Sequence, residues 1–308
     1  MFRLFERRRS ETARGASSRM QEAANASARD LLPPLVIEAE RIARQIRMGV
    51  HGQRRAGTGE DFWQYRPAEP HEPAARIDWR QSARGDTYWV REREAEAAQQ
   101  ILFWRDPSAS MDWRSSAALP TKRDRATLCT LALAAAALQG GERAGLLTGP
   151  EAGRHFGGVH AFPRLAESLM TQQDDAPAPQ ATLMRPWGHA VLVSDFLWPP
   201  EQMESVLRGF AARPARLELL CVLDPAELAL PYSGRVRFEG LEETAALTLS
   251  AVEDLAPAYD AAMRAHLDAL RIIAGRHRAA LTLHHTDQPP LPALLALHAR
   301  LTGGKTLA

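Results

Sequence analysis

Cysteine is scarce in this chain of 308 residues, which has only Cys129 and Cys221, far apart and each inside an apolar run. A disulfide framework is therefore excluded, and no CxxC or cysteine–histidine cluster with the spacing of a zinc site is present. Two reduced, buried thiols are the simplest interpretation. They fit a cytoplasmic protein, which is the location that we expect.

Long hydrophobic runs are also missing. A membrane-spanning helix needs about 20 apolar residues. The longest candidate, "LCTLALAAAAL" at Leu128–Leu138, is about half that length, so we expect a buried helix there and no integral membrane segment. The first 20 residues lack the apolar region of a secretory signal, and we expect residues 1–30 to form a mobile tail.

The chain also lacks an excess of charge of either sign, because 38 basic residues balance 37 acidic ones and the formal net charge is +1. All basic residues are arginines except Lys122 and Lys305. A nucleic-acid-binding surface should be clearly basic, so we do not expect a nucleic-acid partner. Hydrophobic residues make up 45% of the chain, which is enough for a substantial core.

What the sequence does contain is a repeated alternation of apolar strands and helices. Strands are expected at residues 100–104, 144–148, 190–193, 217–223 and 279–284, and helices at 124–139, 163–172, 200–212, 252–274 and 290–301. This alternation is typical of an α/β fold with a mainly parallel sheet and helices on both faces. A hairpin is expected within residues 236–249.

The chain upstream has a different character. Apolar residues at helical spacing predict a helix over residues 35–48. Glycine, proline, arginine and aromatic residues then dominate as far as Arg91, which predicts short strands and turns. We therefore divide the chain into a tail (1–30), a helix followed by a small β-rich segment (31–95), and an α/β domain (96–302).

Oxygen-bearing side chains follow the first strand of the α/β domain in "RDPSASMDW". Asp106, Ser108 and Ser110 alternate there, and Asp195 closes a later strand in "VLVSDF". Parallel strands end at one edge of a sheet, where ligands bind, and oxygen ligands suit Mg²⁺ or Mn²⁺. The alternative is that Asp106 or a serine only caps a helix. The second strand-end carboxylate favours the metal site.

The D-x-S-x-S motif resembles the first half of the metal-ion-dependent adhesion site of von Willebrand factor A domains. The upstream block resembles the signature of domain-of-unknown-function family fifty-eight, a von Willebrand factor A-like family. The matching positions are Gly57, Gly59, Asp61, Phe62, Tyr65 and Arg66, then Ile77, Asp78, Trp79, Ser82, Ala83 and Arg84, then Val90, Arg91 and Glu92.

This resemblance implies a Rossmann-like, von Willebrand factor A-like fold. It also implies a Mg²⁺ or Mn²⁺ site made by Asp106, Ser108 and Ser110, with Asp195 and a threonine from a middle loop. Thr182 is the nearest candidate for that threonine, and Thr171 is a second. The family is commonly paired with a MoxR-type AAA+ ATPase, so the resemblance implies a chaperone-like role in maturing or remodelling an unknown client protein.

Three functions remain open at this point. The first is a non-enzymatic adaptor that binds its partner through the metal. The second is a metal-free scaffold that uses the surface of the IDW-SAR block. The third is a metal-dependent phosphohydrolase, for which no base or nucleophile is positioned, so we do not expect an enzyme. The residues expected to form a partner surface or a network of arginine–carboxylate pairs are Asp61, Arg66, Asp78, Trp79, Arg80 and Arg84.

Overall fold

The computed structural model describes residues 34–48, 62–69, 73–74, 77–93, 98–158, 160–172, 178–186, 188–213, 215–239 and 246–302. The tail expected at residues 1–30 lies outside these ranges, as does Asp61. Contacts divide the chain into two units, His51–Ala98 and the remainder, and each is described by itself. The described residues include no helix that is both long and apolar enough to cross a membrane.

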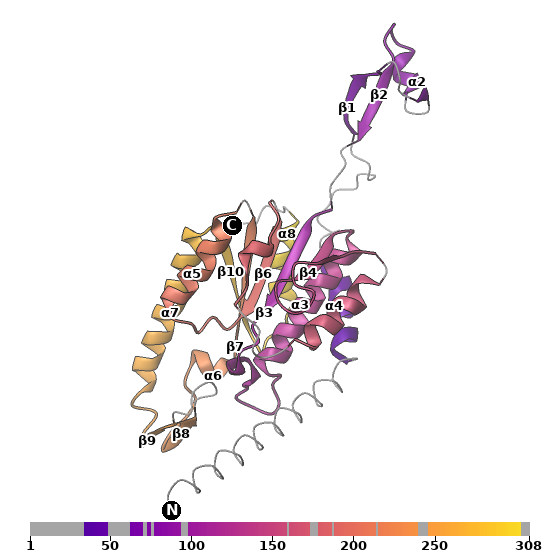
Figure 1. Ribbon diagram of the computed structural model, residues 1–308. Coiled ribbons are helices and arrows are strands. Elements are labelled where there is room, and N and C mark those ends of the chain that lie inside the picture. Colours follow the sequence, from indigo (N-terminus) through magenta and orange to yellow (C-terminus); the bar gives the residue numbers. More distant parts are fainter. Residues whose placement is uncertain are drawn as a thin grey trace, which may run out of the picture. The chain divides into compact units, whose positions relative to one another are not determined.

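The larger unit is built on one six-stranded sheet with the order β10-β7-β6-β3-β4-β5 (Figure 1). All neighbouring strands are parallel except β4 and β5, which pair antiparallel. The strands are β3 (Gln100–Arg105), β4 (Arg143–Leu146), β5 (His155–Phe156), β6 (His189–Ser194), β7 (Arg216–Leu223) and β10 (Ala279–His285). The expected mainly parallel sheet is confirmed, and β5 was missed because two residues show no periodicity.

Helices cover both faces of this sheet, as expected. One hydrophobic core joins the sheet to the helix over residues 34–48 and to α3 (Lys122–Gln139), α4 (Ala161–Met170) and α8 (Leu291–Leu301). A second core joins the opposite face to α5 (Pro200–Ala211) and α7 (Ala256–Arg276). The result is a three-layer α/β arrangement in which the sheet is buried on both sides (Figure 1).

The smaller elements follow the sequence pattern closely. The expected hairpin is present as β8 (Val236–Glu239) paired antiparallel with β9 (Ala246–Leu249). Helix α3 begins at Lys122, two residues earlier than expected, because the Thr121 hydroxyl caps it by accepting a hydrogen bond from the Asp124 amide (3.0 Å). Both cysteines are buried and free.

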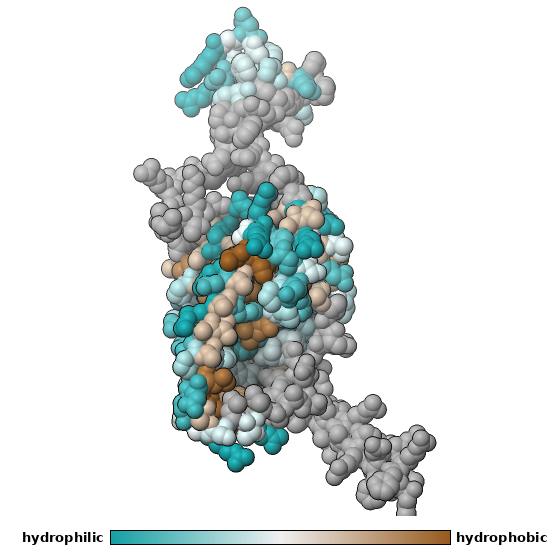
Figure 2. Space-filling model, turned by 90° about the vertical axis from the view of Figure 1, so that its left-hand side faces the viewer, coloured by the Kyte–Doolittle hydropathy of each residue, from teal (hydrophilic) through white to brown (hydrophobic). Residues whose placement is uncertain are grey.

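Figure 2 views the larger unit from the side of α7, where a narrow hydrophobic band crosses a mostly hydrophilic surface. Helix α7 contributes Ile272, an exposed large apolar residue, and its N-cap residue Leu255 is also partly exposed. Single apolar side chains are common on protein surfaces. We therefore assign no role to this face.

The small unit contains a two-stranded antiparallel sheet, β1 (Phe62–Pro67) with β2 (Trp89–Arg93). The short helix α2 (Trp79–Ser82) lies between them in the sequence, and Ile77 forms an isolated bridge with Val90 of β2. The β-rich segment expected upstream of the α/β domain is therefore present.

Gly145 in β4 lies close to the backbone that leads into the outermost strand, β5. A Cβ atom on Gly145 would lie 2.1 Å from the Arg154 carbonyl oxygen, which belongs to the backbone that leads into β5. We expect Gly145→Ala to lower the free energy of unfolding by about 1–3 kcal/mol, because β5 must shift away. Urea unfolding measures the change.

The matched control is Gly275→Ala in α7, where a Cβ would meet nothing within 4 Å. This substitution is expected to stabilise the protein by roughly 0.5–1 kcal/mol, because alanine is the better helix former. Equal unfolding free energies for the Gly145 variant and the wild type would show that the close approach of β5 is not fixed.

Candidate functional site

The carboxyl ends of β3 and β6 meet at one edge of the sheet, because the two strands are parallel neighbours. Asp106 directly follows β3. Its Oδ1 accepts a hydrogen bond from the Ser108 amide (2.9 Å), and its Oδ2 accepts one from the Ser194 hydroxyl at the end of β6 (2.5 Å). Both oxygens of this buried carboxylate therefore accept hydrogen bonds: Oδ1 within its own loop, and Oδ2 across to the end of β6.

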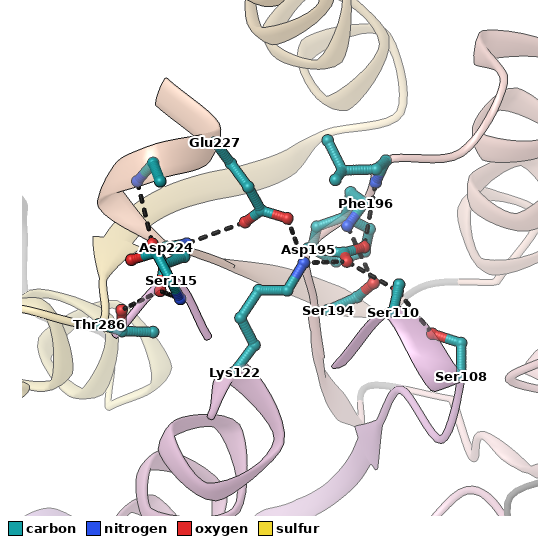
Figure 3. A network of polar contacts seen from close by, with 12 residues as sticks. Ser108, Ser110, Ser115, Lys122, Ser194, Asp195, Phe196, Asp224, Glu227 and Thr286 are labelled. Carbon is teal, nitrogen blue, oxygen red and sulfur yellow. Dashed lines mark hydrogen bonds and ion pairs between the residues drawn. The ribbon is translucent and has the colours of Figure 1, made fainter. Parts of the chain in front are cut away.

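Asp195, the residue after Ser194, is also buried, and both of its carboxylate oxygens also accept hydrogen bonds. Its Oδ1 accepts from the Leu197 amide (3.1 Å), and its Oδ2 accepts from the Ser110 hydroxyl (2.8 Å) and from the Lys122 ammonium (2.7 Å). The Ser108 and Ser110 hydroxyls lie 3.1 Å apart. The four residues that the sequence placed at strand ends, Asp106, Ser108, Ser110 and Asp195, therefore lie close together. Figure 3 shows Ser108, Ser110 and Asp195 side by side.

The turn after β6 has an unusual backbone. Phe196 adopts a positive φ of 50°, which is rare for a bulky residue. Its amide donates to the Ser194 hydroxyl (2.9 Å), and its carbonyl lies 2.9 Å from Nε2 of His266 in α7. The Asp195 carbonyl accepts from the Cys221 thiol (3.2 Å). These contacts hold the strained turn that directs Asp195 into the cluster.

Lys122 in the first turn of α3 occupies the centre of this edge, and the sequence analysis did not single it out. Its side chain is only 1% exposed, and its Nζ lies 2.7 Å from Asp195 Oδ2 and 2.5 Å from Glu227 Oε1. Burial alone would lower the pKa of Lys122, but attraction to the two carboxylates outweighs it and raises that pKa above its ordinary value. The residue is therefore an ammonium ion.

Glu227 brings the end of a third strand into the same cluster. It lies in the short helix α6 (Pro225–Leu228), whose N-cap is Asp224 at the end of β7. The other Glu227 oxygen, Oε2, accepts from the Asp224 amide (2.9 Å). Burial raises the pKa of Glu227 above its ordinary value, although the Lys122 ammonium partly offsets this effect. Lys122 thus links the segments that follow β6 and β7.

Asp224 itself serves as a structural cap. Its Oδ1 accepts from the Ala226 amide (2.9 Å), and its Oδ2 accepts from the Ser115 amide (3.0 Å). The Thr286 hydroxyl after β10 lies 3.5 Å from the same Oδ2. This third strand-end carboxylate therefore joins loops through hydrogen bonds, without contact to the ammonium in the part of the chain that the structure describes (Figure 3).

The structure does not bring the candidate threonines into the cluster. Thr182 is exposed in the short helix η3 (Ala181–Leu183). Arg213, which precedes β7, donates from Nη1 to the nearby Met184 carbonyl (2.9 Å), so this segment lies by the amino ends of the strands. The Thr171 hydroxyl donates to the Glu167 carbonyl at the end of α4 (2.9 Å). The expectation for Thr182 is corrected: it lies at the opposite edge.

The middle loop instead contributes Gln172, which the sequence analysis missed. Its buried side chain donates from Nε2 to the Thr148 hydroxyl after β4 (2.9 Å) and to the Arg105 carbonyl at the end of β3 (3.4 Å). A buried glutamine after a helix has no signal in the sequence that separates it from a surface residue. It ties the end of α4 to the same edge of the sheet.

The oxygen atoms of Asp106 and Asp195 do not fit the metal site that the family resemblance implies. Within the described ranges, all four carboxylate oxygens of Asp106 and Asp195 already accept hydrogen bonds from the protein, and an ammonium supplies the positive charge. No group of three or more His, Cys, Asp or Glu side chains in those ranges is arranged to hold a metal ion. A dication such as Mg²⁺ needs six oxygen ligands in near-octahedral geometry, so we derive no chemistry from a metal here.

Two residues of the IDW-SAR block, Asp78 and Ser82, connect the elements of the small unit through hydrogen bonds. Asp78 caps α2: its Oδ1 accepts from the Arg80 and Gln81 amides (both 3.1 Å), and its Oδ2 accepts from the Tyr65 hydroxyl in β1 (3.3 Å). The Ser82 hydroxyl donates to the Asp78 carbonyl (2.8 Å) and accepts from the Trp89 amide in β2 (2.8 Å). Asp78 and Ser82 therefore fasten α2 to both strands.

Other residues of the block face solvent. Trp79 and Tyr88 are 56% and 60% exposed, and their rings form an edge-to-face pair with centroids 5.8 Å apart. The Arg80 and Arg84 side chains are exposed, and within the described ranges neither guanidinium has a carboxylate partner. Within the described ranges, Arg80 and Arg84 therefore take no part in the expected arginine–carboxylate network, and Asp78 caps α2. Arg66 lies in β1, opposite Val90.

Comparison with known proteins gives the family. Residues 64–269 match the family described as "Protein of unknown function DUF58". The chain belongs to the DUF58 family. The match begins inside β1, so it includes most of the small unit and most of the larger unit, and the family resemblance inferred from the IDW-SAR block is confirmed.

Relatives of this DUF58 chain include two uncharacterized proteins, Rv1480 of Mycobacterium tuberculosis and Mb1516 of Mycobacterium bovis. Each is 30% identical over 247 residues, which cover 75% of this chain and 76% of the relative. Among solved structures, the conserved hypothetical protein BatB from Bacteroides thetaiotaomicron aligns with a TM-score of 0.36 and 11% identity, over 67% of this chain and 98% of BatB. An aerotolerance-related membrane protein from Bacteroides fragilis aligns with a TM-score of 0.34 and 12% identity, over 57% and 100%.

Proposed function

We propose that this DUF58 chain is a non-enzymatic, cytoplasmic protein-binding module that works with a MoxR-type AAA+ ATPase in the maturation or remodelling of a client protein. The observation that carries the proposal is the exposed surface formed by Trp79, Tyr88, Arg80 and Arg84, which we call the Trp79 surface. The family resemblance supports the class of the partner. The geometry supports the choice of surface.

The chemistry of the Trp79 surface favours a protein partner with an acidic segment. Exposed tryptophan, tyrosine and arginine are enriched at protein interfaces and dominate their binding energy. Two guanidinium groups without a carboxylate partner among the described residues can form bidentate hydrogen bonds with the carboxylates of another chain. The edge-to-face pair of Trp79 and Tyr88 offers an apolar contact.

The architecture of the small unit supports the same proposal. Its described secondary structure consists mainly of two strands and one short helix. A two-stranded sheet alone is marginally stable in water and needs packing against another element. A partner that covers the Trp79 surface would supply that packing, so binding and ordering of the unit would reinforce each other.

The sheet-edge cluster supports a binding role more than a catalytic one. A phosphohydrolase would need carboxylate oxygens that are free to hold a metal or to attack the substrate. In the described part of the chain, the oxygens of Asp106 and Asp195 already accept from protein donors, and the cluster organises three loops. This arrangement favours the metal-free scaffold over the metal-linked adaptor.

Binding of the purified ATPase to variants of the full chain tests the proposal. Trp79→Ala is expected to weaken binding by roughly 10–100-fold, which is typical for loss of an aromatic anchor. Arg84→Ala is expected to weaken binding most at low salt, because salt screens the ion pair that this substitution removes. Titration calorimetry measures the dissociation constants. EDTA is expected to leave all of them unchanged.

The matched control is Ile37→Ala, which removes an exposed apolar side chain from the other unit and should leave the affinity at the wild-type value. The proposal is wrong about the surface if Trp79→Ala and Arg84→Ala both bind as tightly as the wild type. Loss of binding in EDTA would instead favour the metal-linked adaptor.

A further inference from the structure

We propose that Lys122 takes the place of a divalent cation at this edge of the sheet, so that the three loops are assembled by a charge that the chain itself supplies. The inference does not depend on the identity of any partner. It arises from a disagreement between the D-x-S-x-S motif, which implies a metal, and the contacts of the residues that should bind it.

The Lys122 ammonium lies between two carboxylates, as a bound cation would. Lys122 Nζ lies within 2.7 Å of one oxygen of Asp195 and within 2.5 Å of one oxygen of Glu227, and the lysine side chain is 1% exposed. Asp195 Oδ2 also accepts from the Ser110 hydroxyl (2.8 Å). One buried cation is thus shared by two carboxylates, one of which also contacts the D-x-S-x-S loop, which is how a bound metal ion would connect these segments (Figure 3).

The start of helix α3 determines where the Lys122 side chain lies. Lys122 is in the first turn of α3, and the Thr121 cap determines where that turn begins. The side chain is therefore delivered from the helix that follows the D-x-S-x-S loop. An ammonium has three donors, and its contacts with Asp195 and Glu227 use two of them. A metal ion at the same point would face a positive charge, so Lys122 and a dication exclude each other.

The distances indicate what could replace the ammonium. Oxygen ligands lie 2.3–2.6 Å from Ca²⁺ and at about 2.1 Å from smaller dications. The Asp195 and Glu227 oxygens already converge on a point at nearly the first of these ranges. Removing the ammonium and its stem would leave two buried carboxylates around a space that water and a dication can enter. Lys122→Ala is therefore expected to create a cation site that the wild type lacks.

Ion binding to the full chain tests this inference. Wild-type protein is expected to show no stoichiometric binding of Ca²⁺ or Mn²⁺ and no shift in melting temperature with either ion. Lys122→Ala is expected to bind one ion, and saturating ion should raise its melting temperature by roughly 5 °C or more. Lys122→Met, which removes the charge but fills the space, should gain no such rise.

A double variant and a refolding measurement complete the test. Lys122→Ala combined with Glu227→Gln should lose the ion-dependent rise, because one of the two carboxylates is gone. If Lys122→Ala is unfolded without ions, refolding on addition of Ca²⁺ or Mn²⁺ supports the inference and failure to refold overturns it. Stoichiometric Mg²⁺ or Mn²⁺ binding by the wild type that Asp195→Asn abolishes would also overturn it.

Discussion

Replacing Lys122 by methionine is expected to lower the free energy of unfolding by about 3–5 kcal/mol, the usual effect of removing one partner from a buried ion pair. Methionine fills a similar space, so the loss comes mainly from charge. Asp195 and Glu227 would remain buried without the ammonium that both contact. Urea unfolding at neutral pH measures the effect.

A surface ion pair provides the control for this prediction. Arg271 pairs with Asp268 on α7, and both side chains are more than half exposed. Arg271→Met is expected to change the free energy of unfolding by less than about 0.5 kcal/mol, because exposed pairs contribute little. A loss below about 1 kcal/mol for Lys122→Met would mean that the ammonium is not the charge that holds the cluster together.

Acid is expected to destabilise the protein between pH 6.5 and about 4 through two buried histidines. Burial, with a smaller contribution from Arg216, lowers the pKa of His189 to about 4. Burial also lowers the pKa of His284 to about 4, aided by Arg125 and His285. Below pH 6.5 the unfolded chain binds protons at these imidazoles while the folded chain does not, so the free energy of unfolding falls with pH.

Each histidine contributes up to ~3 kcal/mol to this loss, since one pKa unit corresponds to about 1.4 kcal/mol. Denaturant unfolding at pH values from 7 to 4.5 measures the slope. His189→Gln and His284→Gln should each flatten it, whereas His160→Gln, at an exposed position before α4, should leave it unchanged. Slopes equal to the wild type in both buried variants would contradict the prediction.

The fold could be predicted from the sequence because its strands are buried on both faces. Apolar runs such as residues 217–223 mark such strands clearly, and the Gly140–Gly141 pair marked the end of α3. Successive strand residues point to opposite faces, and of the adjacent histidines at the end of β10, His284 is buried and His285 is only half-buried. The two-residue strand β5 is too short to show any pattern.

The candidate site was only partly accessible. Strand-end positions identified Asp106 and Asp195, because parallel strands place their carboxyl ends together. Thr182 was misplaced because distance along the chain does not tell which edge of the sheet a loop occupies. Lys122 was missed because its role depends on α6, which lies about a hundred residues later. The signal available was its rarity, as one of two lysines among 38 basic residues.

The positive φ of Phe196 was equally hidden, since bulky residues rarely adopt it and no glycine marks the turn. Within the IDW-SAR block, too, some roles could not be predicted from the sequence. The cap that Asp78 provides for α2 was not predicted, and Arg80 and Arg84, which were expected in an ion-pair network, are exposed. A backbone cap and an ion pair use the same residue types, so the sequence alone does not separate them.

Nuclear magnetic resonance of the lysine ammonium group tests the central claim most directly. In a Lys305→Arg variant, Lys122 is the only lysine of the chain, so ¹⁵N-labelled lysine gives a single ammonium signal. A buried, hydrogen-bonded ammonium should remain visible at neutral pH and should not move when Mg²⁺ is added. A signal that shifts or disappears as Mg²⁺ is titrated would show that a metal ion occupies this edge, and would contradict the account.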